Sequence, residues 1–298
     1  MQSLLPYLQL CRFAAVFTAL ADICMGWLLT HPDLAPEHDF ALLLVSSAGL
    51  YLAGMVFNDV FDRQIDAAER PNRPIPSGRV PLRSAVGFGA ALMLIGVISA
   101  AVVGVQSILV AALLVAAIFL YDGLLKTTPA GPVAMGSCRF LNVMLGASAT
   151  PDRLWALPQL HVALALGTYI VGVTWFARKE TGISSRWHLG GAMLVVNAGL
   201  ILLAAFVLHW PDPGMMTRSW NAALILGAIG VIINRRLSTA VFDPSPARVQ
   251  ASIRTLLMSL VMLDATIVFF ANDNRLYAFG VVLLLLPAQL LARYLAVT

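Results

Sequence analysis

The chain has 298 residues, of which 59% are hydrophobic and only 11% are charged. Soluble globular proteins carry about 25% charged residues, so this composition excludes an ordinary soluble protein and predicts a polytopic membrane protein. The net charge of +4 comes from basic residues in short loops between apolar segments, which indicates membrane topology signals and no nucleic-acid partner.

Ten apolar segments follow one another along the chain, and each reaches or approaches the roughly 20 residues that a membrane-spanning helix requires. They occupy residues 10–30, 39–57, 84–104, 107–122, 132–150, 159–177, 188–208, 216–234, 250–271 and 276–296. Because the fourth and the eighth are short, we expect about nine or ten spans. The connecting loops are also short, so we expect residues 1–298 to form a single membrane-embedded, all-α domain.

The basic loop residues predict the orientation of the chain. If the N-terminus is cytoplasmic, most loop arginines and lysines fall on the cytoplasmic side, as the positive-inside rule requires. Only Arg153, Arg218 and Arg275 then fall on the opposite side. We therefore expect a multi-pass protein of the cytoplasmic (inner) membrane. The loops after the second, fourth and sixth segments would all open on the cytoplasmic side and could form one site.

The end of the second segment carries the most informative pattern. Asn58, Asp62 and Asp66 are four residues apart, and this spacing places their side chains on one face of a helix. Two carboxylates and an amide offer the oxygen ligands that Mg²⁺ prefers. Several arginines follow in the next loop, and this mixture of charges indicates a metal-bridged phosphate site. The alternative is a helix end that is charged only because it meets water.

These residues also carry a family resemblance. The run from Asn58 to Asp66, followed by Arg70 and Arg73, resembles the first signature of the UbiA-type intramembrane prenyltransferases. Further residues that look like this family, and in particular like its Ebo-operon branch, are Tyr121, Lys126, Gly136, Ser137, Arg139 and Asn142. The resemblance implies a helical bundle around a central cavity. It also implies Mg²⁺-dependent transfer of an isoprenyl group from a prenyl diphosphate to an acceptor that the sequence does not identify.

The same resemblance assigns roles to individual residues. It implies that the metal and the diphosphate are held by Asn58, Asp62 and Asp66, which would be the catalytic residues. Further substrate-binding side chains would be Arg73, Lys126 and Arg139 on the diphosphate oxygens, with Tyr121 in the pocket wall.

The chain departs from the family pattern at the end of the sixth segment. The two expected aspartates are replaced by Thr174 and Arg178, and Thr127 stands where a basic residue is expected. One hypothesis is an active enzyme in which Arg178 or Lys179 replaces a second Mg²⁺. Glu180 could still reach a metal, although it lies two residues away from the expected acidic position. An arginine can bind phosphate oxygens in a bidentate fork, so this replacement is chemically sound. The other hypothesis is a non-catalytic component that binds or transports a lipid diphosphate.

Arg139 and Asp264 both lie inside apolar segments. An arginine in a span costs about 2.5–3.5 kcal/mol unless it faces a polar cavity or a partner, so Arg139 is a candidate functional residue. Its alternative is a buried structural pair with a backbone carbonyl or with Asn142. Asp264 either faces the cavity or makes a helix–helix hydrogen bond. Asp122-Gly123 begins like the CDP-alcohol phosphotransferase signature, but Lys126 breaks that pattern.

Overall fold

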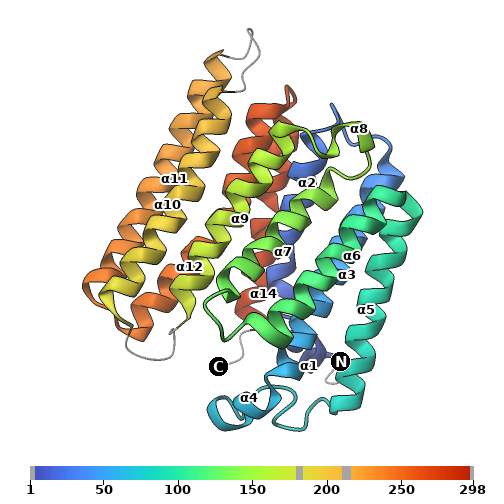
Figure 1. Cartoon of the computed structure of the whole chain (residues 1–298), viewed down its shortest axis with the longest axis vertical. Coiled ribbons are helices and arrows are strands. Elements are labelled where there is room, and N and C mark those ends of the chain that lie inside the picture. The colour runs from blue at the N-terminus through green and yellow to red at the C-terminus, as the bar shows by residue number, and fades with distance from the viewer. Residues whose placement is uncertain (1–3, 179–183, 210–215, 296–298) are drawn as a thin grey trace.

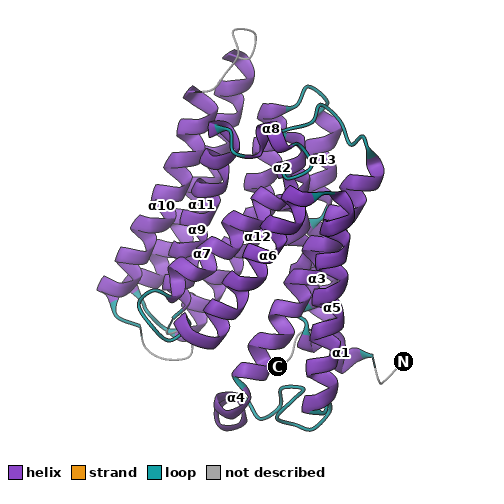
Figure 2. Cartoon of the chain, turned by 45° about the vertical axis from the view of Figure 1, so that its right-hand side comes forward, coloured by secondary structure: helices purple, strands orange, loops and turns teal. Residues whose placement is uncertain are grey.

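The computed structural model describes residues 4–178, 184–209 and 216–295, and these residues form helices joined by turns and loops (Figure 2). In chain order the helical segments are α1 (Leu5–Leu10), η1 (Phe13–Ala15), α2 (Val16–Leu28), α3 (Glu37–Phe61), α4 (Arg63–Glu69), α5 (Leu82–Val103), α6 (Val105–Leu120), η2 (Tyr121–Leu125), α7 (Gly131–Gly146), α8 (Pro151–Leu154), α9 (Leu157–Ala177), α10 (Arg186–His209), α11 (Met216–Phe242), α12 (Pro246–Ala271), α13 (Arg275–Leu283) and α14 (Leu285–Leu295). The predicted all-α class is confirmed.

Within the described residues, 8 helical segments are long and apolar enough to cross a membrane. The expected spans 10–30 and 132–150 correspond to shorter helices, at Phe13–Leu28 and in the 16 residues of α7. At about 1.5 Å per residue, 16 residues reach roughly 24 Å, which is less than the roughly 30 Å hydrocarbon core. α2 and α7 pack against each other, and α2 is buried along most of its length. The prediction of a polytopic helical bundle is therefore confirmed, with two of its expected spans shorter than predicted.

Hydropathy located the helices better than it located their ends. The short fourth segment forms a helix of 21 residues when η2 is included, Val105–Leu125. The eighth segment was predicted to end at residue 234, but α11 continues past Arg235 and Arg236 to Phe242. A helix can extend beyond the hydrocarbon region into water, and there its polarity rises without any break in its backbone hydrogen bonds.

Glycines allow several helices to approach each other closely. A Cβ atom at Gly49 of α3 would lie 2.7 Å from the carbonyl oxygen of Leu92 in α5. A Cβ atom at Gly136 of α7 would lie 2.6 Å from the carbonyl oxygen of Gly167 in α9. Small residues at such crossings are typical of membrane helix packing, where van der Waals contact holds the helices together.

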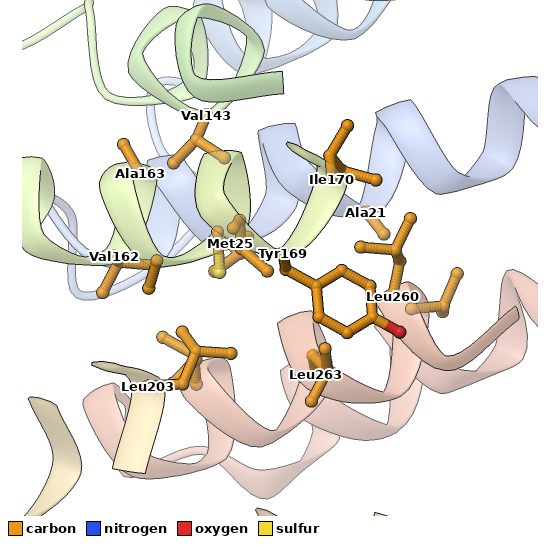
Figure 3. Close-up of a cluster of buried hydrophobic side chains, with 14 of the residues drawn as sticks. Ala21, Met25, Val143, Val162, Ala163, Tyr169, Ile170, Leu203, Leu260 and Leu263 are labelled. Atoms are coloured by element: carbon orange, nitrogen blue, oxygen red, sulfur yellow. The ribbon is translucent and has the colours of Figure 1, made fainter. Parts of the chain in front are cut away.

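The core lies where α2, α9, α10 and α12 meet. Tyr169 of α9 is fully buried there among Met25, Leu203 and Leu263 (Figure 3). Its hydroxyl donates a hydrogen bond to the carbonyl oxygen of Leu256 at 3.0 Å. α10 and α11 lie side by side at one flank of the bundle, and α4 projects from one end (Figure 1). The candidate site lies at the α4 end.

Candidate active site

A cavity of about 780 Å³ opens beside α4 and extends into the bundle. This volume lies within the range of small-molecule binding sites. Its walls come from α2, α3, α4, α6, η2, α7, α9 and α12. The predicted residues that line it are Asn58, Asp62, Asp66, Arg73, Tyr121, Lys126, Arg139 and Arg178. The structure therefore brings all eight predicted site residues to one cavity, from five different parts of the chain.

The junction of α3 and α4 keeps the acidic ladder on one face. α3 ends at Phe61, yet the amide of Asp62 still donates to the carbonyl of Asn58 at 3.0 Å. The amide of Asp66 in turn donates to the carbonyl of Asp62 at 2.8 Å. These four-residue hydrogen bonds preserve the helical periodicity across the junction. The three side chains consequently line the same cavity, as their spacing predicted.

Each carboxylate of the ladder faces a cationic side chain. Lys126, which follows η2, forms an ion pair with Asp62. Arg73, from the loop after α4, donates to Asp66 at 2.6 Å and to Asp59 at 3.1 Å. Both arrangements join residues that the resemblance had assigned to one diphosphate site. A diphosphate entering the cavity would therefore meet cations that are already held at its mouth.

The turn η2 adds a carboxylate that the sequence interpretation did not assign to the site. Asp122 lines the cavity, and its Oδ1 accepts a hydrogen bond from Nδ2 of Asn58 at 2.7 Å. η2 is a π-helical turn, a local distortion that is often found at functional sites. The available signal was an aspartate at the end of an apolar span, four residues before Lys126.

Arg12 is a second residue that the sequence interpretation missed. It lies between α1 and η1 and lines the cavity. Its guanidinium donates to Oδ1 of Asp59 at 3.3 Å and to Oδ1 of Asn58 at 3.5 Å. The backbone of Arg12 is left-handed, with φ 47° and ψ 48°. For a residue with a Cβ this conformation costs about 1–2 kcal/mol, so packing and the contacts of the side chain must hold it there.

The opposite wall is formed by the end of α9. Thr174 and Arg178 both line the cavity there, at the positions where aspartates were expected. Nη2 of Arg178 donates to the carbonyl oxygens of Thr127 at 3.1 Å and Thr128 at 2.9 Å. This wall therefore presents a hydroxyl and a guanidinium to the cavity. The proposed roles of Lys179 and Glu180 lie outside the described residues.

Arg139 lies at the inner part of the cavity and has a buried partner. Its Nη1 donates to Asp22 at 2.5 Å and to the carbonyl of Thr18 at 3.0 Å. Asn142 also donates to Asp22, at 2.8 Å. The structure thus shows the buried pair that was the alternative for Arg139, although the acid was not identified from the sequence. Asp264 of α12 is fully buried and is not among the residues that line the cavity.

The oxygen atoms at the cavity mouth suit a magnesium ion. Asp62, Asp66, Asp122 and Asn58 offer carboxylate and amide oxygens, which are the ligands of hard divalent cations. Among the described residues, no three acidic, histidine or cysteine side chains are close enough together to form a ready metal site. Asp62 and Asp66 hold Lys126 and Arg73 instead. The donor set therefore fits Mg²⁺ once Lys126 and Arg73 move from these carboxylates to the diphosphate oxygens.

Comparison with known proteins agrees with this geometry. The UbiA prenyltransferase family matches residues 15–260, which is most of the chain. The chain belongs to the UbiA prenyltransferase family. Similar curated members include the digeranylgeranylglyceryl phosphate synthase of Methanopyrus kandleri, which is 35% identical over 267 residues, or 76% of this chain and 97% of the relative. The synthase of Sulfurisphaera tokodaii is 26% identical over 65% of this chain and 76% of its own length.

Solved structures of UbiA homologues share the fold. A homologue from Archaeoglobus fulgidus, determined with GPP and Mg²⁺ bound, gives a TM-score of 0.64 at 17% identity and covers 93% of this chain and 99% of its own. A homologue from Aeropyrum pernix gives a TM-score of 0.66 at 20% identity, with coverage of 85% and 96%. The chain is thus a multi-pass membrane prenyltransferase with a UbiA-like helical fold.

Proposed function

We propose that this UbiA-family protein transfers an isoprenyl group from a prenyl diphosphate to an acceptor in the cytoplasmic membrane, with Mg²⁺ as cofactor. The observation that carries the proposal is the pairing of the acidic ladder with cations at the mouth of the cavity. Asp62 faces Lys126, and Asp66 faces Arg73. Related structures with GPP and Mg²⁺ support this choice of substrate and metal.

The chemistry requires a site that stabilises a strongly anionic leaving group. The bond between C1 of the prenyl chain and the diphosphate oxygen breaks, and the diphosphate keeps the electron pair. The acceptor forms the new bond to C1 and loses a proton. Lys126, Arg73 and Arg178 neutralise charge on the departing diphosphate, and fixed charges of this kind are often the largest catalytic contribution. Mg²⁺, held by Asn58, Asp62 and Asp66, would supply further positive charge at the diphosphate oxygens.

Apolar and aromatic residues of the same cavity suit the prenyl chain. Leu50, Gly54, Leu114 and Ile118 line it beyond the acidic ladder, and Tyr121 lies near the ladder. A wall with few polar groups binds an isoprenyl tail and keeps water away from the reacting carbon. An aromatic face at Tyr121 also suits the positive charge that develops there. The tail would therefore extend inward while the diphosphate stays at the mouth.

The relatives indicate a class of acceptor. Because the relatives are digeranylgeranylglyceryl phosphate synthases, a glycerol phosphate lipid is the first acceptor to test. An aromatic ring, a sugar or cyclitol hydroxyl and another lipid headgroup are the remaining classes. The narrower assignment to the Ebo-operon branch rests on two segments, one with Tyr121 and Lys126 and one with Arg139 and Asn142. It stays a prediction because the relatives named above are digeranylgeranylglyceryl phosphate synthases.

A second candidate function is a non-catalytic component that binds or carries a lipid diphosphate. Thr174 and Arg178 favour it, because the wall of α9 lacks the two carboxylates that the family pattern places there. Arg178 would still attract a diphosphate, but the second metal would have no carboxylate of α9 to bind.

One experiment separates the two functions. Purified protein is incubated with Mg²⁺, a panel of prenyl diphosphates and a membrane extract as acceptor source, and pyrophosphate release is followed. We expect release that requires Mg²⁺ and disappears in Asp62→Ala. The control is Asp152→Ala, which removes an exposed aspartate from α8. Saturable diphosphate binding without release would instead establish the carrier function, and the absence of both would exclude both functions.

A further inference from the structure

We propose that Asp122 is a ligand of the divalent cation and that its carboxylate replaces an acidic group missing from the α9 wall. The metal site would then be built from the α3–α4 junction and the π-helical turn η2. This inference rests on the proposed function, because it concerns the same diphosphate site. It adds a residue that neither the acidic ladder nor the family signature contains.

The position of Asp122 supports this role first. Oδ1 of Asp122 is 2.7 Å from Nδ2 of Asn58, and Asn58 is the first residue of the acidic ladder. Asp122, Asn58 and Asp62 all line the cavity. A carboxylate one hydrogen bond away from an expected ligand needs only a side-chain adjustment to share the same ion. Rotation of the Asn58 amide would turn its oxygen toward that ion.

The charges around Asp122 suit a divalent cation between Asp122 of η2 and Asp62 at the α3–α4 junction. Asp122 lines the same cavity as Asp62 and Lys126, and it precedes Lys126 by four residues. Lys126 itself is paired with Asp62. The ammonium group of Lys126 therefore already neutralises one of the carboxylates at this corner. When Lys126 turns to a diphosphate, Asp62 and Asp122 are left with two negative charges that a divalent cation would neutralise.

The opposite wall explains why an extra carboxylate is needed on this side. Thr174 and Arg178 line the cavity without offering a carboxylate. Mg²⁺ in phosphate sites is commonly held by one or two carboxylates together with the substrate oxygens. Asp62 and Asp66 supply that number, Asp122 would add a carboxylate where the α9 wall offers none, and Arg178 provides positive charge on the other side of the diphosphate. The corner therefore assembles a site for one metal ion.

The test measures metal binding directly. Mn²⁺ replaces Mg²⁺ as a paramagnetic probe, and its binding to the purified full-length protein, loaded with a non-hydrolysable prenyl thiodiphosphate, is followed by electron paramagnetic resonance. Asp122→Asn removes the charge but keeps the shape and an oxygen that can still accept from Asn58. We expect the Mn²⁺ affinity to fall by about tenfold or more, since loss of even an outer-shell partner of a metal site costs about 10–100-fold. Metal-free binding of the same thiodiphosphate should not weaken, because Asp122→Asn removes a negative charge beside an anionic ligand.

The matched control is Glu69→Gln, which removes one negative charge from an exposed residue that lines the same cavity. We expect it to leave the Mn²⁺ affinity unchanged. The inference is overturned if folded Asp122→Asn binds Mn²⁺ as tightly as the wild type, or if Glu69→Gln loses as much affinity. A wild-type protein that binds the thiodiphosphate but no Mn²⁺ also overturns it, whereas a wild type that binds neither overturns the proposed function itself.

Discussion

At the scale of single residues, the pair of Arg139 and Asp22 shows how a charge is kept inside the bundle. Both side chains are buried or nearly so, with 10% and 0% of their surfaces exposed. Removing one partner of such a pair leaves an uncompensated charge, which costs about 3–5 kcal/mol. Arg139 also lines the cavity, so the pair connects the stability of the fold with the inner part of the site.

The variant Asp22→Asn tests this pair. We expect it to lower stability by about 3–5 kcal/mol, measured as a lower midpoint of unfolding in detergent. The double variant Asp22→Asn with Arg139→Gln should recover part of the loss, because no unpaired charge is left. If Asp22→Asn instead keeps full stability while diphosphate binding is lost, Arg139 acts mainly on the substrate.

Arg178 is the cationic side chain of the α9 wall. Its guanidinium bonds two carbonyl oxygens at the cavity rim and remains charged whatever its partners. We expect Arg178→Ala to weaken binding of a prenyl thiodiphosphate by about tenfold, in line with roughly 1.5–3 kcal/mol for a hydrogen bond to a charged group. Thr174→Ala, on the same wall, is the comparison and should have little effect. Equal and negligible effects of the two variants would remove Arg178 from the site.

At the scale of helices, close packing at glycines holds the cavity walls in place. α3 carries Asn58 and leads into the rest of the acidic ladder, and it contacts α5 at Gly49. Any side chain there must push the two backbones apart, because the obstructing atom is a carbonyl oxygen. The position of the ladder therefore depends on a residue that carries no chemistry itself.

Gly49→Ala should consequently destabilise the protein by about 1–3 kcal/mol, the usual penalty for overpacking. The measurement is the midpoint of thermal unfolding in detergent. Gly227→Ala in α11 is the matched control, since a Cβ atom there meets nothing within 4 Å. Alanine also has the higher helix propensity, so the control should be neutral or slightly stabilising. Equal midpoints for both variants would contradict the close contact.

Helix periodicity predicted the ladder because its three members belong to one continuous stretch of chain. It could not predict Asp22 as the partner of Arg139, because 117 positions separate them and only the fold brings α2 to α7. Asn58 and Asp122 are 64 positions apart in the sequence, and their contact was missed for the same reason. Arg12 was missed because a single arginine at the start of an apolar span is also a common topology signal.

At the scale of the whole molecule, hydropathy predicted where the helices lie because lipid requires long apolar segments. It did not predict that α2 and α7 are short, since a helix enclosed by other helices need not match the bilayer thickness. The sidedness of the protein depends on the basic loops. We propose that the α4 end of the bundle, with the cavity mouth, faces the cytoplasm.

Cysteine labelling tests this orientation. In a variant without Cys11, Cys24 and Cys138, we introduce Ser77→Cys in the loop after α4 or Asp152→Cys in α8. A membrane-impermeant maleimide should label Asp152→Cys from the outside of intact cells. Ser77→Cys should react only after the membrane is opened. The reverse pattern would place the cavity mouth on the outside.

The ion pairs at the cavity mouth also bear on the order in which ligands enter. Asp62 and Asp66 are already neutralised by Lys126 and Arg73. A metal ion that enters alone would have to displace both cationic side chains from their carboxylates, and they would lose these anionic partners. A metal ion that arrives complexed to its diphosphate offers those cations new anionic partners in the same event. We therefore expect the two ligands to load as one complex, with little metal uptake beforehand at physiological concentrations.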